Sequence, residues 1–169
     1  AGIFAPTVLM AVTEAYAAVL QGSSFVTAGY GRNSATENID WLSLRITPNG
    51  QLDSTYGAAG VARLDYMGFA DNARSLVALP DRRLLLVGGG RVSETNSDAM
   101  LGLLSENGQR VATFGTNGLR AYELGGASDF FWGAAVSPSG THVAIVGTKQ
   151  VAAGMGNDDS VVMLMPLPR

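Results

Sequence analysis

The sequence predicts an all-β fold in a single domain over residues 1–169, built from three copies of one unit. The first observation is a repeat. A shift of 58 residues places Gly57 on Gly115 and Gly60 on Gly118, so that "QLDSTYGAAG" returns as "QRVATFGTNG". The second is that short apolar and β-branched runs are bounded by Gly, Pro, Asn and Asp, as strands usually are. No long stretch keeps a convincing 3.6-residue period, so strands are favoured over helices.

The three copies cover approximately residues 2–59, 60–117 and 118–169, and they start at Gly2, Gly60 and Gly118. The middle copy contains four strand-like runs, "GVARLDY", "ARSLVALP", "RLLLVGG" and "DAMLGLLS". A repeated four-stranded unit is typical of the blades of a β-propeller. We therefore expect about three four-stranded blades. By analogy with propellers of the WD-repeat kind, the second run would be innermost and the run after the glycine turn outermost.

Four segments carry a resemblance to a known family: "VALPDRRLLLVGG", "VSPSGTHVAIVG", "DWLSLRITPNGQLDSTYGAAG" and "ENGQRVATFGTNG". Their pattern resembles the delta-60 repeat family over essentially the whole chain. Arg82 departs from it by replacing a turn glycine, and the last glycine turn is missing. The resemblance implies a propeller-like fold in a bacterial secreted or cell-envelope protein, extracellular or periplasmic. It implies no common enzymatic activity.

Three blades are too few to close a ring, because known propellers have about 4–8. An open arc leaves sheet edges exposed, which natural proteins avoid. We therefore expect the ring to be completed by a second copy, as a homodimer, or by another protein. Residues 2–10 would serve as a clasp that supplies the outer strand missing beside residues 160–166.

The composition excludes several classes of function. The net charge of −3 and the absence of a run of Lys or Arg argue against nucleic acid. The chain has no Cys and one His, so thiol chemistry and multi-histidine metal centres are excluded, and we expect no metal or cofactor. The apolar start "AGIFAPTVLMAV" is too short to span a membrane. Without an initiator Met, the chain resembles a mature or excised product.

Two kinds of side chain are candidates for ligand binding. Asp71 and Asp129 are repeat mates in loops expected at one end of the scaffold, where they would contribute to a cation or sugar site or an acid–base pair. The alternative is that each aspartate caps a turn by accepting backbone N–H bonds. Phe130 and Trp132, within "DFFWG", would form an exposed aromatic surface or else pack between blades.

Other recurring residues are interpreted as structural. Gly57 and Gly60, with their mates Gly115 and Gly118, are expected to have positive φ, and Gly2 marks the same position in the first copy. The regular recurrence of Asp40 and Asp98, with Asp158 or Asp159 in the third copy, indicates a structural role at the start of a strand. "GMGNDDS" lacks the spacing of a calcium loop. His142 has no nucleophile elbow to pair with.

The sequence therefore favours a non-catalytic propeller, a scaffold or partner-binding module. Two alternatives stay open: a carbohydrate- or cation-binding propeller that acts through Asp71, Asp129 and Trp132, and a subunit of an enzyme whose active site is completed by another chain.

Overall fold

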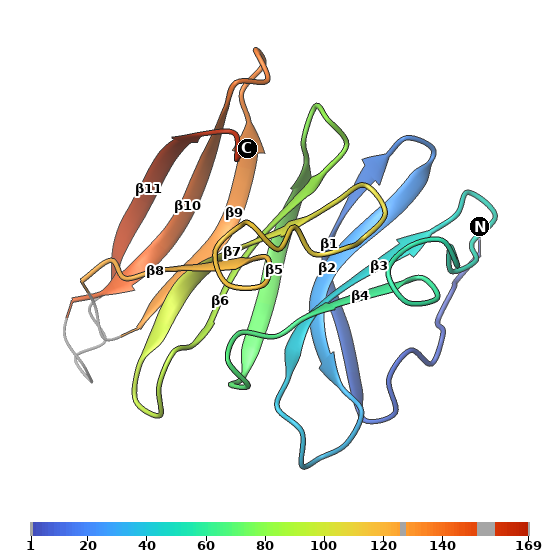
Figure 1. Cartoon of the computed structure of the whole chain (residues 1–169), viewed down its shortest axis with the longest axis horizontal. Helices are drawn as coiled ribbons and strands as arrows, with labels where there is room; N and C mark the ends of the chain where they lie inside the picture. The colour runs from blue at the N-terminus through green and yellow to red at the C-terminus, as the bar shows by residue number, and fades with distance from the viewer. Residues whose placement is uncertain (1, 126–127, 152–157, 169) are drawn as a thin grey trace.

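The computed structural model describes residues 2–125, 128–151 and 158–168, and these residues fold into β-strands and loops without a helix. The strands form three antiparallel sheets that stand side by side, with the second sheet between the other two (Figure 1). The predicted all-β fold is therefore confirmed.

Two of the three sheets have four strands. The first sheet has the order β1 (Val12–Gln21), β2 (Ser24–Arg32), β3 (Asp40–Ile46) and β4 (Val61–Leu64). The second repeats it with β5 (Asp71–Ala78), β6 (Leu84–Arg91), β7 (Ser97–Leu104) and β8 (Leu119–Tyr122). The third has β9 (Asp129–Val136), β10 (His142–Gln150) and β11 (Asp158–Pro166). Four-stranded units thus hold for two copies, and the third sheet has three strands within the described ranges.

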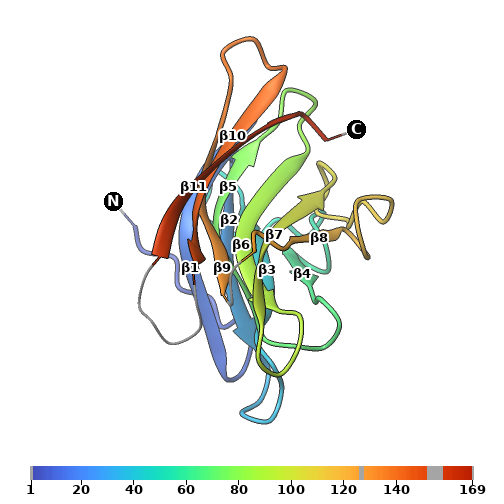
Figure 2. The same cartoon turned by 90° about the vertical axis from the view of Figure 1, so that its left-hand side faces the viewer.

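Each of the first two sheets takes its last strand from the start of the next sequence copy. The strands β4 and β8 directly follow Gly60 and Gly118, and each pairs with the third strand of the sheet before it. The inner strands β1, β5 and β9 pack next to one another, β1 on β5 and β5 on β9. Figure 2 shows β4 and β8 on the side of the molecule away from β1. This agrees with the expected inner and outer strands.

The glycine turn is reproduced almost bond for bond in the first two sheets. Gly57 and Gly115 have φ of 56° and 61°, and an added Cβ would lie 2.1 Å and 2.0 Å from a backbone oxygen of the next strand. A side chain at either position is therefore excluded by both conformation and space. Gly60 and Gly118 also have positive φ. The four glycines thus have the conformation that the sequence predicts.

The chain start differs from the expectation. Gly2 is exposed, without a positive φ, and residues 2–10 form no strand. The turn at Gly60 is held by a hydrogen bond from the N–H of Arg45 in β3 to the Gly60 carbonyl. The segment instead runs beside the first sheet, with Leu9 close to Gly31 and Leu42. Within one chain the clasp is therefore not formed.

The hydrophobic core lies in two layers between the sheets. The first junction, between the first and second sheets, contains thirteen buried residues, and the second junction contains ten. Each junction places the inner strand of the later sheet against the face of the earlier one, β5 on β1–β3 and β9 on β5–β7. Burial of this apolar area is the main force that holds the sheets together.

Candidate functional site

Asp71 and Asp129 begin the inner strands β5 and β9, and both side chains are fully buried. Oδ2 of each accepts a hydrogen bond from a backbone N–H five residues earlier, that of Tyr66 at 2.7 Å and that of Leu124 at 2.8 Å. Each aspartate thus closes the loop that connects an outer strand to the next inner strand. This is the capping role that the sequence left open as an alternative, and neither carboxylate is accessible to a ligand.

Burial also changes the acidity of this position. The pKa of Asp71 is raised to about 8, chiefly because burial disfavours the charged carboxylate, although the Tyr66 N–H opposes the rise. Its Oδ1 has no hydrogen-bond partner among the residues that the structure describes, and the same is true of Oδ1 of Asp129. At neutral pH Asp71 is therefore largely protonated.

Each inner strand contains one irregularity in its pairing, at the same position of the repeat. The pairing of β1 with β2 shifts between Ala15 and Ala17, and that of β5 with β6 between Ala73 and Ser75. The pairing of β9 with β10 likewise passes over one residue. A residue left unpaired in a β-bulge has its side chain turned in a new direction. The unpaired residues are Tyr16, Arg74 and Trp132, which we call the bulge row.

A glycine on the second strand stands opposite each bulge. At these three positions an added Cβ would lie between 1.8 and 2.3 Å from a carbonyl oxygen of the inner strand. The bulge therefore brings the two backbones too close for any side chain. The glycines are Gly29, Gly88 and Gly147.

The bulge row gathers into one cluster on the inner strands. The guanidinium carbon of Arg74 lies 4.1 Å from the ring centroid of Tyr16 and 5.9 Å from that of Trp132. The rings of Tyr30 and Phe130 are also 5.9 Å from it. Arg74 is thus surrounded by four aromatic rings, an arrangement in which a cation is attracted to the ring faces.

The polar atoms of this cluster are only partly paired. The hydroxyl of Tyr16 donates to Oε2 of Glu14 at 2.7 Å, and this bond is the main reason why the pKa of Glu14 is lowered. Nε1 of Trp132 donates to the hydroxyl of Thr148 at 3.1 Å. Nε of Arg74 is buried and finds no acceptor in the described part of the chain.

The structure separates the three aromatic residues of "DFFWG". Phe131 is fully buried in the second junction, where its ring meets the edge of Tyr122. Phe130 is half-buried, and Trp132 keeps 49% of its surface exposed. Their rings pack together at a centroid distance of 4.5 Å. Phe130 and Trp132 are therefore available at the surface, as the ligand-binding prediction requires.

The recurring aspartates at the third strands share a position but differ in their partners. Asp40 forms an ion pair with Arg63, whereas Asp98 accepts a hydrogen bond from Nδ2 of Asn96 at 2.9 Å. Burial raises the pKa of both carboxyl groups. In the third sheet the position belongs to Asp159, which pairs with Lys149 as Asp98 pairs with Gly90.

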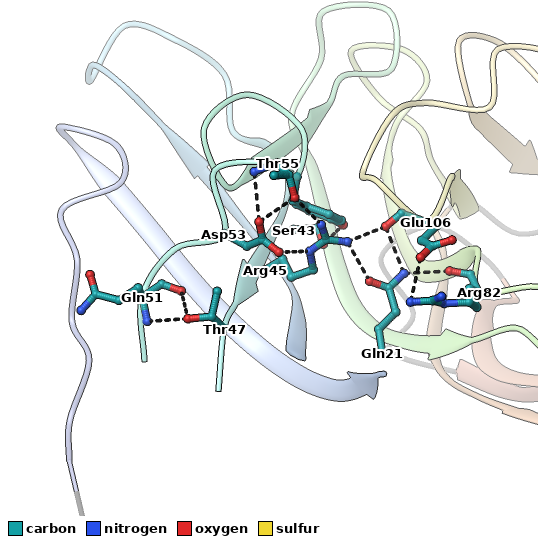
Figure 3. Close-up of polar contacts among 10 residues, drawn as sticks. Gln21, Ser43, Arg45, Thr47, Gln51, Asp53, Thr55, Arg82 and Glu106 are labelled. Atoms are coloured by element: carbon teal, nitrogen blue, oxygen red, sulfur yellow. Dashed lines mark hydrogen bonds and ion pairs between the residues drawn. The ribbon is translucent and has the colours of Figure 1, made fainter. Parts of the chain in front are cut away.

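Sequence reasoning missed a polar network at the first junction (Figure 3). Arg45 of β3 donates to Oδ2 of Asp53 at 2.8 Å and to the carbonyl of Glu106, in the second sheet's turn, at 2.8 Å. Gln21 of β1 accepts from Arg45 and donates to the carbonyl of Arg82 at 2.7 Å. The signal was present, because Arg45 in the strand "DWLSLRI" stands where the repeat mate is Leu103.

Catalytic and metal chemistry find little support in the geometry. The His142 ring is exposed and shares a hydrogen bond with the Thr141 hydroxyl rather than with a carboxylate. Within residues 2–125, 128–151 and 158–168, no group of three or more His, Asp or Glu side chains is placed to hold a metal ion. Most of "GMGNDDS", residues 154–157, lies outside the described residues.

Comparison with models of known protein families gives no match, and comparison with curated proteins gives none either. In the residues that the structure covers, no helix is long and apolar enough to cross a membrane.

Proposed function

We propose that the protein is a non-catalytic scaffold of the propeller type, whose ring is completed by a second copy of the chain. One observation supports this most strongly. The face of the third sheet that carries Val146, Val162 and Leu164, which we call the open face, is exposed, although the same face of each preceding sheet is buried by the next one.

The comparison with the second sheet is direct. Val162 and Leu164 stand where Leu101 and Leu103 stand in the second sheet, as the strand pairings show. The side chains of Leu101 and Leu103 are fully buried, whereas Val162 is 74% and Leu164 69% exposed. The equivalent face is thus covered in the first and second sheets and uncovered in the third. Large exposed apolar surfaces are typical of interaction sites.

The chain carries a matching surface at its other end. In β5 and β9, the residues that pack into the preceding sheet include Leu76 and Ala134. Their repeat mate in β1 is Ala18, which is exposed, as are its neighbours Leu20 and Phe25 on the same face. The exposed face of β1 in one copy is therefore the surface that would pack on the open face of another copy.

Two copies joined twice in this way would give six blades, within the range of about 4–8 that closed propellers use. Residues 3–6 are the repeat mates of β4, so in such a ring they would pair with the free edge of β11 in the partner. Ile3 is almost fully exposed in the single chain. This double contact is symmetric, as most soluble homo-oligomers are.

Sedimentation velocity over a range of micromolar concentrations tests the proposal. The expected species has twice the chain mass of 17.5 kDa. Leu164→Lys places a charge on the open face and is expected to give the monomer. Met67→Lys, at an apolar residue that is equally exposed but lies in the loop after β4, is expected to keep the dimer. A wild-type chain that sediments as a monomer would falsify the proposal.

A further inference from the structure

We propose that the bulge row binds a neutral sugar ring of a glycan, with Tyr16 and Trp132 as the stacking surfaces and Arg74 and Glu14 as the polar contacts. The inference depends on the inner strands of a single chain and is independent of whether the ring is completed by a second copy.

Tyr16 and Trp132 give the bulge row an aromatic surface. Trp132 is 49% and Tyr16 46% exposed. Tyr16 lies on β1 and Trp132 on β9, and Arg74 lies on β5 between these two strands. Each ring is fixed by a hydrogen bond from its polar atom, to Thr148 and to Glu14. The Tyr16 ring also contacts the Arg74 guanidinium and stacks on Tyr30, so the surface offered is its exposed part together with the exposed part of Trp132. Rigid ring surfaces of this kind cost little conformational entropy on binding, and the C–H face of a pyranose is their natural complement.

Two polar groups, Arg74 and Glu14, lie beside these rings. Arg74 is half-buried and has a planar guanidinium that lies among the rings, and Glu14 is exposed and offers carboxylate oxygens. Hydrogen bonds from a guanidinium and to a carboxylate match adjacent hydroxyl groups, each of which both donates and accepts. The site thus combines an apolar surface with a few convergent polar groups, as ligand sites usually do.

The opposite charges of Arg74 and Glu14 disfavour charged ligands. Arg74 and Glu14 together carry no net charge, so an anion meets Glu14 and a cation meets Arg74 at close range. The position that a ligand cation would take among the aromatic rings is already held by the Arg74 guanidinium, 4.1 Å from the centroid of Tyr16. A neutral polyhydroxy ring is the ligand that this arrangement favours.

The test is a titration of the full chain with neutral oligosaccharides of glucose, mannose, galactose and N-acetylglucosamine, followed by tryptophan fluorescence. The chain contains two tryptophans, and Trp41 is fully buried, so a change in emission reports on Trp132. Polygalacturonate and choline serve as the anionic and cationic comparisons. We expect saturable binding of at least one neutral oligosaccharide and no saturable response to either charged probe.

Variants then locate the site. Trp132→Ala and Tyr16→Ala are expected to weaken binding, measured by calorimetry, by about tenfold, or about 1.4 kcal/mol, because each removes an aromatic anchor. Arg74→Lys keeps the charge but loses the planar fork and is expected to weaken binding as well. Met67→Ala is the control, since Met67 is 66% exposed but lies in the loop after β4, away from the bulge row.

In Trp132→Ala the emission of Trp41 shows whether the fold is intact, and Trp132→Phe, which keeps a stacking ring, is expected to retain most of the affinity. The proposal is overturned by the absence of binding across the neutral panel, by preferential binding of choline or polygalacturonate, or by an equal loss in Met67→Ala.

Discussion

The two junctions between sheets have the same backbone geometry but are filled in different ways. At the second junction, β7 presents Leu101 and Leu103 to the third sheet, and both are fully buried among apolar neighbours. At the first junction their repeat mates are Ser43 and Arg45, which take part in a hydrogen-bonded network. The repeat therefore fixes where the strands lie, and the interface between two sheets can be filled by either polar or apolar side chains if the polar groups are paired.

The large aromatic ring comes from the earlier sheet at the first junction and from the later sheet at the second. Trp41 of β3 fills the first junction, opposite an inner strand that carries the small Ala73. At the second junction the repeat mate of Trp41 is Ala99, and the ring comes from Phe131 on the inner strand. Each junction thus contains one large and one small residue at these positions, which keeps the packed volume similar.

The largest expected effect comes from removing the ring at the apolar junction. Phe131→Ala is expected to lower the free energy of unfolding by about 3–5 kcal/mol, because it leaves a cavity in a fully buried cluster. Urea denaturation followed by circular dichroism measures the change. Adding Ala99→Trp, which moves the ring to the other strand as at the first junction, is expected to recover part of the loss. No recovery would contradict the idea that the two junctions are volume-matched alternatives.

The next effect concerns the polar junction. Arg45→Leu makes the first junction resemble the second, but it leaves Oε1 of Gln21 without its donor and Asp53 without its ion partner. The carbonyl of Glu106 keeps only the donor from Gln21. We expect a loss of about 3 kcal/mol in the free energy of unfolding, from buried acceptors that are no longer paired. Urea denaturation is again the measurement. The matched substitution Leu103→Met at the second junction is expected to cost less than about 1.5 kcal/mol, and an equal cost for both would show that the network contributes little.

A third effect, smaller within any one pH unit, is the pH dependence contributed by the start of β5. The pKa of Asp71 is about 8 in the folded chain and about 3.9 when unfolded, so the folded state holds the proton between these values. The stability contributed by Asp71 is therefore greatest below pH 4 and falls as pH rises to 8, by at most about 1.4 kcal/mol per unit. Asp71→Asn is expected to flatten this fall in thermal denaturation between pH 5 and 8. An unchanged slope in the variant would rule out Asp71 as its source.

The smallest effect is at the hairpin turn beside the first junction. Arg82 has φ of 69°, whereas its counterpart beside the second junction is Gly140, with φ of 64°. Arg82→Gly is expected to raise the free energy of unfolding by about 1 kcal/mol, because glycine adopts this conformation without strain. The loss of the exposed Arg82–Glu106 pair offsets little of this gain. Gly140→Ala is the reverse control and is expected to lower stability in the same denaturation assay.

The repeat was predictable because it rests on local chemistry. Glycines at Gly57 and Gly115 are required by their own turn, and strand patterns depend on neighbours in sequence, so both are visible in the chain itself. The bulge row was not predictable, because Tyr16, Arg74 and Trp132 share no residue type and their relation depends on strand pairing. Sequence reasoning gave Asp71 and Asp129 a ligand role as one of two interpretations, and burial, which is a tertiary property, favours the other.

The sequence by itself determined the all-β class, the three copies and the turn glycines, since each follows from short-range pattern and backbone conformation. Tertiary structure decided which face of each sheet is covered, which carboxylates are buried, and which side chains meet at the inner strands. These depend on how sheets pack over long distances in the chain. Residues alike in sequence position, such as Leu103 and Arg45, therefore have different partners, and Leu101 is buried where Val162 is exposed.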